Sequence, residues 1–200
     1  MNYLTFLKHA EKVTKGKHLK ARPILQGVHH TSEYVVCTDS YRLHRVALPQ
    51  EHLVGKTINP KTGEELTNGS YPNTSGLVPD VNDALATVQL DVNAVIRFLK
   101  AVKAAKMNTQ GSVYFILKDE RVHLVAEDGG FKFTYDTGQR VNEFGTTYFN
   151  WQYLLDALEW LKEYDSTCTL YWYAYNRPFV VMPNYAPHEA LALILPIRKA

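Results

Sequence analysis

Histidines and one cysteine near the amino end are the residues whose types could bind a metal. His29, His30 and His44 lie close in sequence to Cys37, and imidazole nitrogen and thiolate sulfur are common zinc ligands. Successive side chains of a β-strand point to opposite faces of the sheet. His29 and His30 could therefore bind one ion only across a bulge, and the spacing matches no zinc-binding motif. We predict no metal site and no cofactor.

Sequence patterns typical of catalysis are also absent. No Ser-His-Asp order, nucleophile elbow or phosphate-binding glycine loop occurs in the chain. Asp128-Gly129-Gly130 is typical of a hairpin turn. The sequence therefore favours a protein that is not an enzyme. An enzyme built on a borrowed fold is a further alternative, which tightly bound zinc, or a nuclease activity lost with His30, would favour.

The distribution of charge indicates a surface for nucleic acid. The formal net charge is only +2, but residues 1–22 hold six basic residues against one acidic residue. A local basic surface is the electrostatic signature of phosphate contacts. A solvated helix face gives the same pattern, and the acidic stretch at 151–165 argues against a uniformly basic surface. The tyrosine-rich stretch at 171–175 could stack on bases, although packing within a sheet is the simpler interpretation.

Three segments share one layout, a short strand, an amphipathic helix and two or three further strands. They cover about 1–50, 87–138 and 145–198. Apolar residues at helical spacing predict helices over 5–15, 92–102 and 151–161, with Asp91 and Asn150 as N-caps of the last two. Alternating apolar residues and turn residues predict the strands, which are 23–28, 34–37, 43–48, 88–90, 112–117, 122–126, 131–135, 147–149, 167–174, 179–182 and 190–197.

Composition limits the class of protein. Hydrophobic residues are 46% and charged residues 21%, as in ordinary globular proteins. No apolar run reaches the roughly 18 residues of a membrane span, and the amino end does not read as a signal peptide. Cys37 and Cys168 form no disulfide framework and are typical of small buried side chains in a reducing compartment. We predict a cytoplasmic protein.

Several short motifs, taken in order along the chain, resemble the bacterial sliding clamp, the β subunit of DNA polymerase III. RPILQGV at 22–28 and CTDSYRL at 37–43 resemble the opening of the clamp's middle domain. GSYPN at 69–73 and LVP at 77–79 are similar to the elements that close that domain. YFN at 148–150 with YLLDAL at 153–158 resembles a helix of the last domain, and LILPIR at 193–198 resembles the clamp's terminal Met-Pro-x-Arg.

The resemblance implies an α+β, DNA-clamp fold of repeated βαβββ modules with helices on one face of antiparallel sheets. It divides the chain into a half clamp domain at 1–50, an irregular insert at 51–86 and a complete clamp domain of two modules at 87–200. The clamp's first domain and part of its middle domain have no counterpart here. Ser40-Tyr41 stands where the family usually has Gly-His, and Leu195 where it usually has Met.

The resemblance also implies two sites. The first is a peptide-binding pocket at a module junction, with apolar walls and a few polar anchors. Its residues here would be Leu25, Thr38, Ser40, Tyr41, Arg42, Leu43, Pro72, Leu77, Leu193, Leu195, Pro196, Ile197 and Arg198. The alternative is that these residues only pack the junction. The second is a helix face toward DNA, formed by Lys8, Lys12, Lys15, Arg97, Lys100 and Lys103, with contacts to phosphates alone.

The function implied is that of a processivity factor of DNA replication. It would bind clamp-binding peptides of polymerase and repair proteins and, as a homo-oligomer, could encircle DNA. Three modules per chain predict that four copies would supply the twelve modules of a ring. The alternative is a monomeric mimic or adaptor, of phage or prophage origin, that competes for the same partners without encircling DNA.

Overall fold

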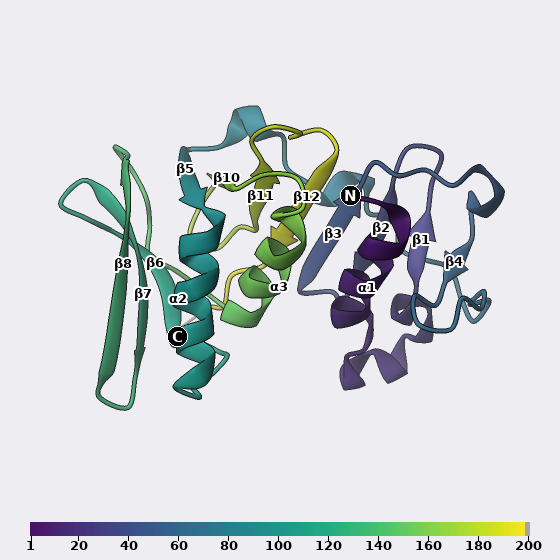
Figure 1. Ribbon diagram of the computed structural model, residues 1–200, viewed down its shortest axis with the longest axis horizontal. Coiled ribbons are helices and arrows are strands. Elements are labelled where there is room, and N and C mark those ends of the chain that lie inside the picture. The colour runs from purple at the N-terminus through teal and green to yellow at the C-terminus, as the bar shows by residue number, and fades with distance from the viewer. Residues whose placement is uncertain (199–200) are drawn as a thin grey trace.

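The computed structural model describes residues 1–198, and Figure 1 shows its elements. Helices α1 (Tyr3–Thr14), α2 (Val92–Ala104) and α3 (Trp151–Leu161) lie side by side across the front of the molecule in this view. The side chain of Asp91 accepts a hydrogen bond from the Ala94 amide, and that of Asn150 from the Gln152 amide. Both predicted N-caps are therefore confirmed.

Twelve strands form two antiparallel sheets within the described residues. The sheet orders are β4-β1-β2-β3-β12-β11-β10-β5 and β8-β7-β6-β9. The strands are β1 (Val28–His30), β2 (Val35–Thr38), β3 (Arg42–Val46), β4 (Thr57–Ile58), β5 (Ala86–Asp91), β6 (Val113–Lys118), β7 (Arg121–Asp128), β8 (Phe131–Arg140), β9 (Thr147–Phe149), β10 (Thr167–Trp172), β11 (Phe179–Pro183) and β12 (Ala190–Ile194). The predicted α+β architecture, with helices packed on antiparallel sheets, is confirmed.

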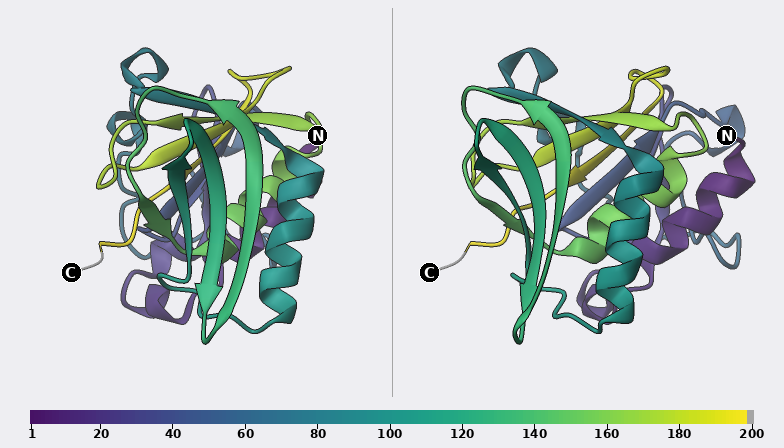
Figure 2. Two further views of the ribbon diagram at one scale, coloured as in Figure 1. Left: turned by 90° about the vertical axis from the view of Figure 1, so that its left-hand side faces the viewer. Right: turned by 60° about the vertical axis from the view of Figure 1, so that its left-hand side comes forward.

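The modules are joined by exchanged strands. We call α1 with β1–β3 the first module, β5 with α2 and β6–β8 the second, and β9 with α3 and β10–β12 the third. Strand β5 of the second module pairs with β10 of the third, and β9 of the third pairs with β6 of the second (Figure 2). The first module joins the third through β3 and β12, so one sheet runs across both (Figure 1).

Three predicted strands differ from the structure by more than two residues at one end: those at 23–28 and 190–197, and that at 131–135, which continues to Arg140 as β8. Residues 23–26 form a 3₁₀-helix (Pro23–Gln26), and strand β1 starts only at Val28. Proline fixes φ at a helical value and lacks an amide donor, so it favours the first turn of a helix over a ladder position. The last strand ends at Ile194, because the chain then leaves the sheet and Leu195 donates its amide to the Tyr41 carbonyl.

The predicted irregular segment at 51–86 contains one strand and three 3₁₀-helices, Glu51–Leu53, Ser75–Leu77 and Val81–Asp83. Strand β4 extends the sheet beside β1. The chain then folds back, so that the Leu66 amide donates to the Thr57 carbonyl at 2.8 Å and Glu65 bridges Ile58. This hairpin covers the outer edge of β4.

The main core lies between the helices and the sheets. Phe6, Val95, Leu99, Leu158 and Trp160 bring the apolar faces of the three helices into it. Cys37 and Cys168 are buried free thiols. None of the helices in residues 1–198 is long and apolar enough to cross a bilayer.

Candidate functional site

The corner between β2 and β3 is fixed by its own polar side chains. Asp39 accepts from the backbone amides of Tyr41 and Arg42, each at 3.0 Å. The Thr38 hydroxyl donates to the Arg42 carbonyl at 2.7 Å and accepts from the Ser40 amide. Ser40 has a φ of 76°, a conformation that glycine adopts at lower cost. The result is a tight corner that exposes the Tyr41 ring.

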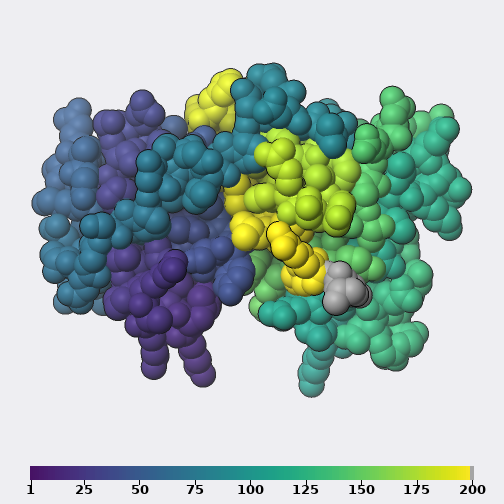
Figure 3. Space-filling model, turned by 180° about the vertical axis from the view of Figure 1, so that it is seen from behind, coloured from purple at the N-terminus to yellow at the C-terminus, as the bar shows by residue number. Residues whose placement is uncertain are grey.

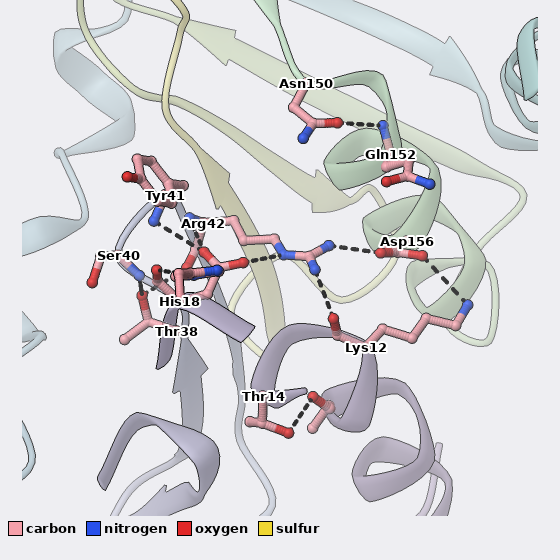
Figure 4. A network of polar contacts seen from close by, with 12 residues as sticks. Lys12, Thr14, His18, Thr38, Ser40, Tyr41, Arg42, Asn150, Gln152 and Asp156 are labelled. Atoms are coloured by element: carbon pink, nitrogen blue, oxygen red, sulfur yellow. Dashed lines mark hydrogen bonds and ion pairs between the residues drawn. The ribbon is translucent and has the colours of Figure 1, made fainter. Parts of the chain in front are cut away.

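Arg42 connects this corner to two helices (Figure 4). Its guanidinium donates to Asp39 at 2.9 Å, to Asp156 of α3 at 2.7 Å and to the Lys12 carbonyl of α1 at 2.7 Å. Its Cζ atom lies 4.4 Å from the centre of the Tyr153 ring. Burial alone would lower the pKa of Arg42, but the two carboxylates raise it above its ordinary value. Arg42 therefore remains charged and links the first module to the third through ion pairs and hydrogen bonds.

The carboxyl-terminal tail meets the same corner. Leu43 lies opposite Leu193 in the β3–β12 ladder. Beyond the ladder, the Leu195 amide donates to the Tyr41 carbonyl at 2.9 Å and the Ile197 amide donates to the Tyr148 carbonyl at 2.7 Å. In the view from behind, the tail crosses the surface at the junction of the modules (Figure 3). Two segments that are far apart in sequence therefore lie side by side.

A groove of about 630 Å³ opens beside this tail. It has an aromatic and aliphatic wall with polar groups at its edges, as peptide-binding pockets do. Its lining residues are His18, Tyr41, Gln110, Asn150, Tyr153, Leu195, Pro196, Ile197 and Arg198. Five of the thirteen residues of the predicted pocket line it, namely Tyr41, Leu195, Pro196, Ile197 and Arg198.

The sequence did not single out the other four lining residues as site residues. Tyr153 and Asn150 belong to the YFN and YLLDAL motifs, which were the signal that could have indicated them. His18 reaches the groove because its ring hydrogen-bonds the corner, with Nε2 3.2 Å from the Asp39 carbonyl. No sequence signal marks His18 or Gln110, because only the folded chain brings them to the groove.

The remaining predicted pocket residues lie elsewhere. Thr38 and Arg42 are buried and do not line the groove. Thr38 bonds within the corner, and Arg42 bonds Asp39, Asp156 and the Lys12 carbonyl. Leu43 and Leu193 are buried on the outer face of the sheet. Ser40 is exposed at the corner but does not line the groove, and Leu25 packs with Leu19, Ile24, Leu66 and Tyr71.

Part of the insert lies over that outer face. Tyr71, Val78, Val81 and Ala84 pack against the cluster that contains Leu43 and Leu193. Pro72 and Leu77 remain exposed, and 52% of the Leu77 surface is open to solvent. Leu43 and Leu193, which were predicted to form apolar walls of the pocket, are therefore covered by the insert. The open groove lies beside the 195–198 tail.

The predicted basic residues lie on α1 and its C-cap, and on α2. Lys12 bonds Glu159 and lies 3.6 Å from Asp156, and Lys100 lies 3.7 Å from Glu159. The acidic residues of α3 therefore neutralise part of this positive charge. Lys8, Lys15, Arg97 and Lys103 are exposed, and no ion pair involves them among the described residues.

The histidines that could have bound a metal have other contacts. The His29 ring stacks on Tyr71, and its Nδ1 lies 3.0 Å from the Thr57 hydroxyl. His30 lies on the other face, where its Nε2 is 2.7 Å from the Tyr3 hydroxyl. Across residues 1–198, no group of three histidine, cysteine or acidic side chains is placed to hold a metal ion.

Comparison of the whole chain with known proteins identifies its fold. No family model matches the sequence, and no curated protein matches it either. Among solved structures, the DNA polymerase III β chain of Streptococcus pneumoniae superposes with a TM-score of 0.78 at 22% identity, covering 98% of this chain and 63% of that one. The Bacillus subtilis sliding clamp gives 0.77 at 17% identity, with the same coverage of 98% and 63%. The chain has the sliding-clamp fold.

The Caulobacter crescentus clamp agrees, with a TM-score of 0.76 at 16% identity over 100% of this chain and 65% of the clamp. The chain thus spans a little under two thirds of the length of the clamps it resembles. The likeness extends over the first module, the insert and the two later modules, so the whole described chain belongs to this fold.

Proposed function

We propose that the groove beside the tail binds short linear peptides of DNA polymerase and repair proteins. The proposal is carried by one observation: on a clamp fold, the Tyr41 corner and the 195–198 tail converge on an open groove. Leu195, Pro196 and Ile197 would contact an aliphatic or aromatic anchor of the peptide, and one such anchor can supply most of the affinity. Asn150 and Arg198, at the polar edges, would bond the peptide backbone or an acidic side chain.

A fluorescence-polarisation titration with a Gln-Leu-x-Leu-Phe-type peptide tests the proposal. Tyr41 is 53% exposed and Tyr185 is 87% exposed, so aspartate at either position should leave the fold intact. We expect Tyr41→Asp to weaken binding at least about tenfold, and Tyr185→Asp to bind like the unaltered protein. Equal affinities for both variants, or no binding by the unaltered protein, would refute the peptide site. Arg42 and Leu193 are unsuitable test positions because both are buried.

We further propose that the exposed cations of α1 and α2 contact DNA phosphates. Such binding is independent of sequence and weakens steeply with salt. Pairing of Lys12 and Lys100 with α3 carboxylates leaves the exposed Lys8, Lys15, Arg97 and Lys103 for the contact. The role that follows is a clamp-like docking protein of DNA replication.

A second candidate function is an adaptor that occupies the same partners without encircling DNA. The hairpin that covers the edge of β4 favours it, because that end of the sheet is closed to another strand. Retention on nicked circular DNA that disappears when the DNA is linearised would support a ring. Peptide binding without such retention would support the adaptor.

A further inference from the structure

Strand β8 is a long sheet edge with aromatic side chains in the open. It runs over ten residues and pairs with β7 on one side, and no strand of residues 1–198 pairs with its other side. Phe131 is 64% and Phe133 37% exposed. Proteins usually protect such edges with proline, bulges or short strands, and the 131–136 stretch has no proline and an unbroken register with β7.

The outward backbone groups of β8 follow from its hairpin. Gly129 and Gly130, both at positive φ, form a two-residue turn that Asp128 and Phe131 close. In an antiparallel pair, hydrogen-bonded residues alternate with non-bonded ones. Phe131, Phe133 and Tyr135 therefore exchange bonds with β7. The N–H and C=O groups of the even-numbered residues from 132 to 136 point to the open edge.

The molecule itself shows what kind of strand fits this edge. Each module ends in a strand that follows its helix and two earlier strands: β3, β8 and β12. The last strands of the first and third modules pair with each other, antiparallel, at the β3–β12 joint. Among the described residues, β8 is therefore the only module-ending strand that has one edge unpaired. Of the other sheet edges, β4 is covered by the 59–66 hairpin, β9 is bridged by Pro196 and β5 contacts β8.

We propose that β8 binds β8 of a second copy, antiparallel about a two-fold axis through Thr134. This register bonds the outward amides and carbonyls of both strands. It also places Lys132 opposite Asp136 of the second copy, and Phe133 opposite its Tyr135, on the helix side of the sheet. Opposite charges and aromatic pairs are the cross-strand neighbours that stabilise a sheet. The strand is thus complementary to itself, as a two-fold interface requires.

The consequence is a dimer with all its helices on one side. The two-fold axis of an antiparallel ladder is perpendicular to the sheet, so the α1–α3 faces of the two copies adjoin. The pair would form an arc of six modules with a first module at each end. This interface rests on the open edge alone and holds whether or not the groove binds peptides.

Disulfide trapping tests the register. Only residue 134 lies opposite itself, at the roughly 5.5 Å Cα separation of a bonded pair, within disulfide range. Two copies of residue 132 would lie about 14 Å apart. With the native thiols buried, Thr134→Cys should form a covalent dimer on mild oxidation and Lys132→Cys should not. Equal trapping of both, or of neither, overturns the proposal.

Solution mass, measured by light scattering, tests the interface without cysteine. We expect twice the 22.8 kDa of the chain for the unaltered protein. Thr134→Pro removes one outward amide per strand and should weaken dimerisation roughly tenfold. Lys132→Asp should weaken it as well, and Lys132→Asp with Asp136→Lys should restore it. Lys118→Asp, away from the edge, is the control. A monomer, or a dimer indifferent to these changes, refutes the interface.

Discussion

The guanidinium of Arg42 in β3 donates to the carboxylate of Asp156 in α3 across 2.7 Å. The same group donates to Asp39, whose side chain is only 2% exposed. The bond joins the first module to the third. Because these charges are mostly withdrawn from water, each depends on the others for its solvation.

Removal of the arginine should therefore cost much of the stability of the joint. Arg42→Ala leaves Asp39 buried without its partner, and we expect a loss of about 3–5 kcal/mol in the free energy of unfolding. Urea denaturation measures it. Arg121→Ala is the matched control, since its pair with Asp136 is 45% and 40% exposed and exposed ion pairs contribute little to stability. Similar losses for both would contradict the role of Arg42.

Replacement of Ser40 by glycine should stabilise the folded protein. The Ser40 φ of 76° is costly for a residue with a Cβ atom. Ser40→Gly should raise the free energy of unfolding by about 0.5–1 kcal/mol and leave peptide binding in the groove unchanged. Thermal melting checks this. Ser32→Gly, in a turn without positive φ, should lower the free energy of unfolding slightly. An equal gain at both positions would show that the positive φ of Ser40 is not the cause.

His44 should make the protein sensitive to acid. Burial lowers its pKa well below 6.5, and the nearby charges of Arg42, His9 and Lys12 lower it further. Within residues 1–198, neither ring nitrogen has a hydrogen-bond partner, and the ring lies 5.4 Å from that of Trp160. In the unfolded chain the His44 imidazole binds a proton near pH 6.5, whereas in the folded chain it stays neutral at that pH. The free energy of unfolding therefore falls as the pH drops through and below 6.5.

His44→Leu should reduce this acid dependence by up to about one proton, because leucine has nothing to protonate. Unfolding free energies between pH 7 and pH 5 measure the slope. His52→Gln is the control, since His52 is exposed. An unchanged slope in His44→Leu would show that other groups, such as His9 and His30, whose pKa values burial also lowers, carry the dependence.

DNA binding, if the exposed cations mediate it, should have a predictable salt dependence. Lys15→Glu with Lys103→Glu should weaken binding and reduce the slope of log K against log salt by about 0.9 for each phosphate that the protein no longer neutralises. Filter binding over a salt series measures it. Lys118→Glu with Arg177→Glu makes the same change in net charge at exposed positions outside the helices, and should alter the slope less. Equal effects would indicate a diffuse electrostatic attraction.

Much of the fold was predictable because its signals are local. Asp91 and Asn150 mark the starts of α2 and α3, and apolar spacing gives their buried faces. Gly129 and Gly130 mark a turn wherever they lie in the fold. The prediction failed at 23–26, where the apolar run Ile24-Leu25 fits either a strand or a helical turn and the preceding proline decides for the turn.

The site was predictable only in part. The motifs predict that residues 193–198 and the 38–43 corner meet, and they do. Arg42 and Thr38 were expected to face a peptide, but their own carboxylate and carbonyl partners hold them inside the corner. His18 and Gln110 carried no signal at all.

The sequence by itself determined the helices, the turns and the order of the modules, since each depends on residues within a few positions of one another. Only the tertiary structure decided which strands cross between modules, which leucines are covered by the insert, and that β8 keeps an open edge. Those outcomes depend on pairing and packing between residues far apart in the chain, and the energy of such contacts is set by the whole fold rather than by any local pattern.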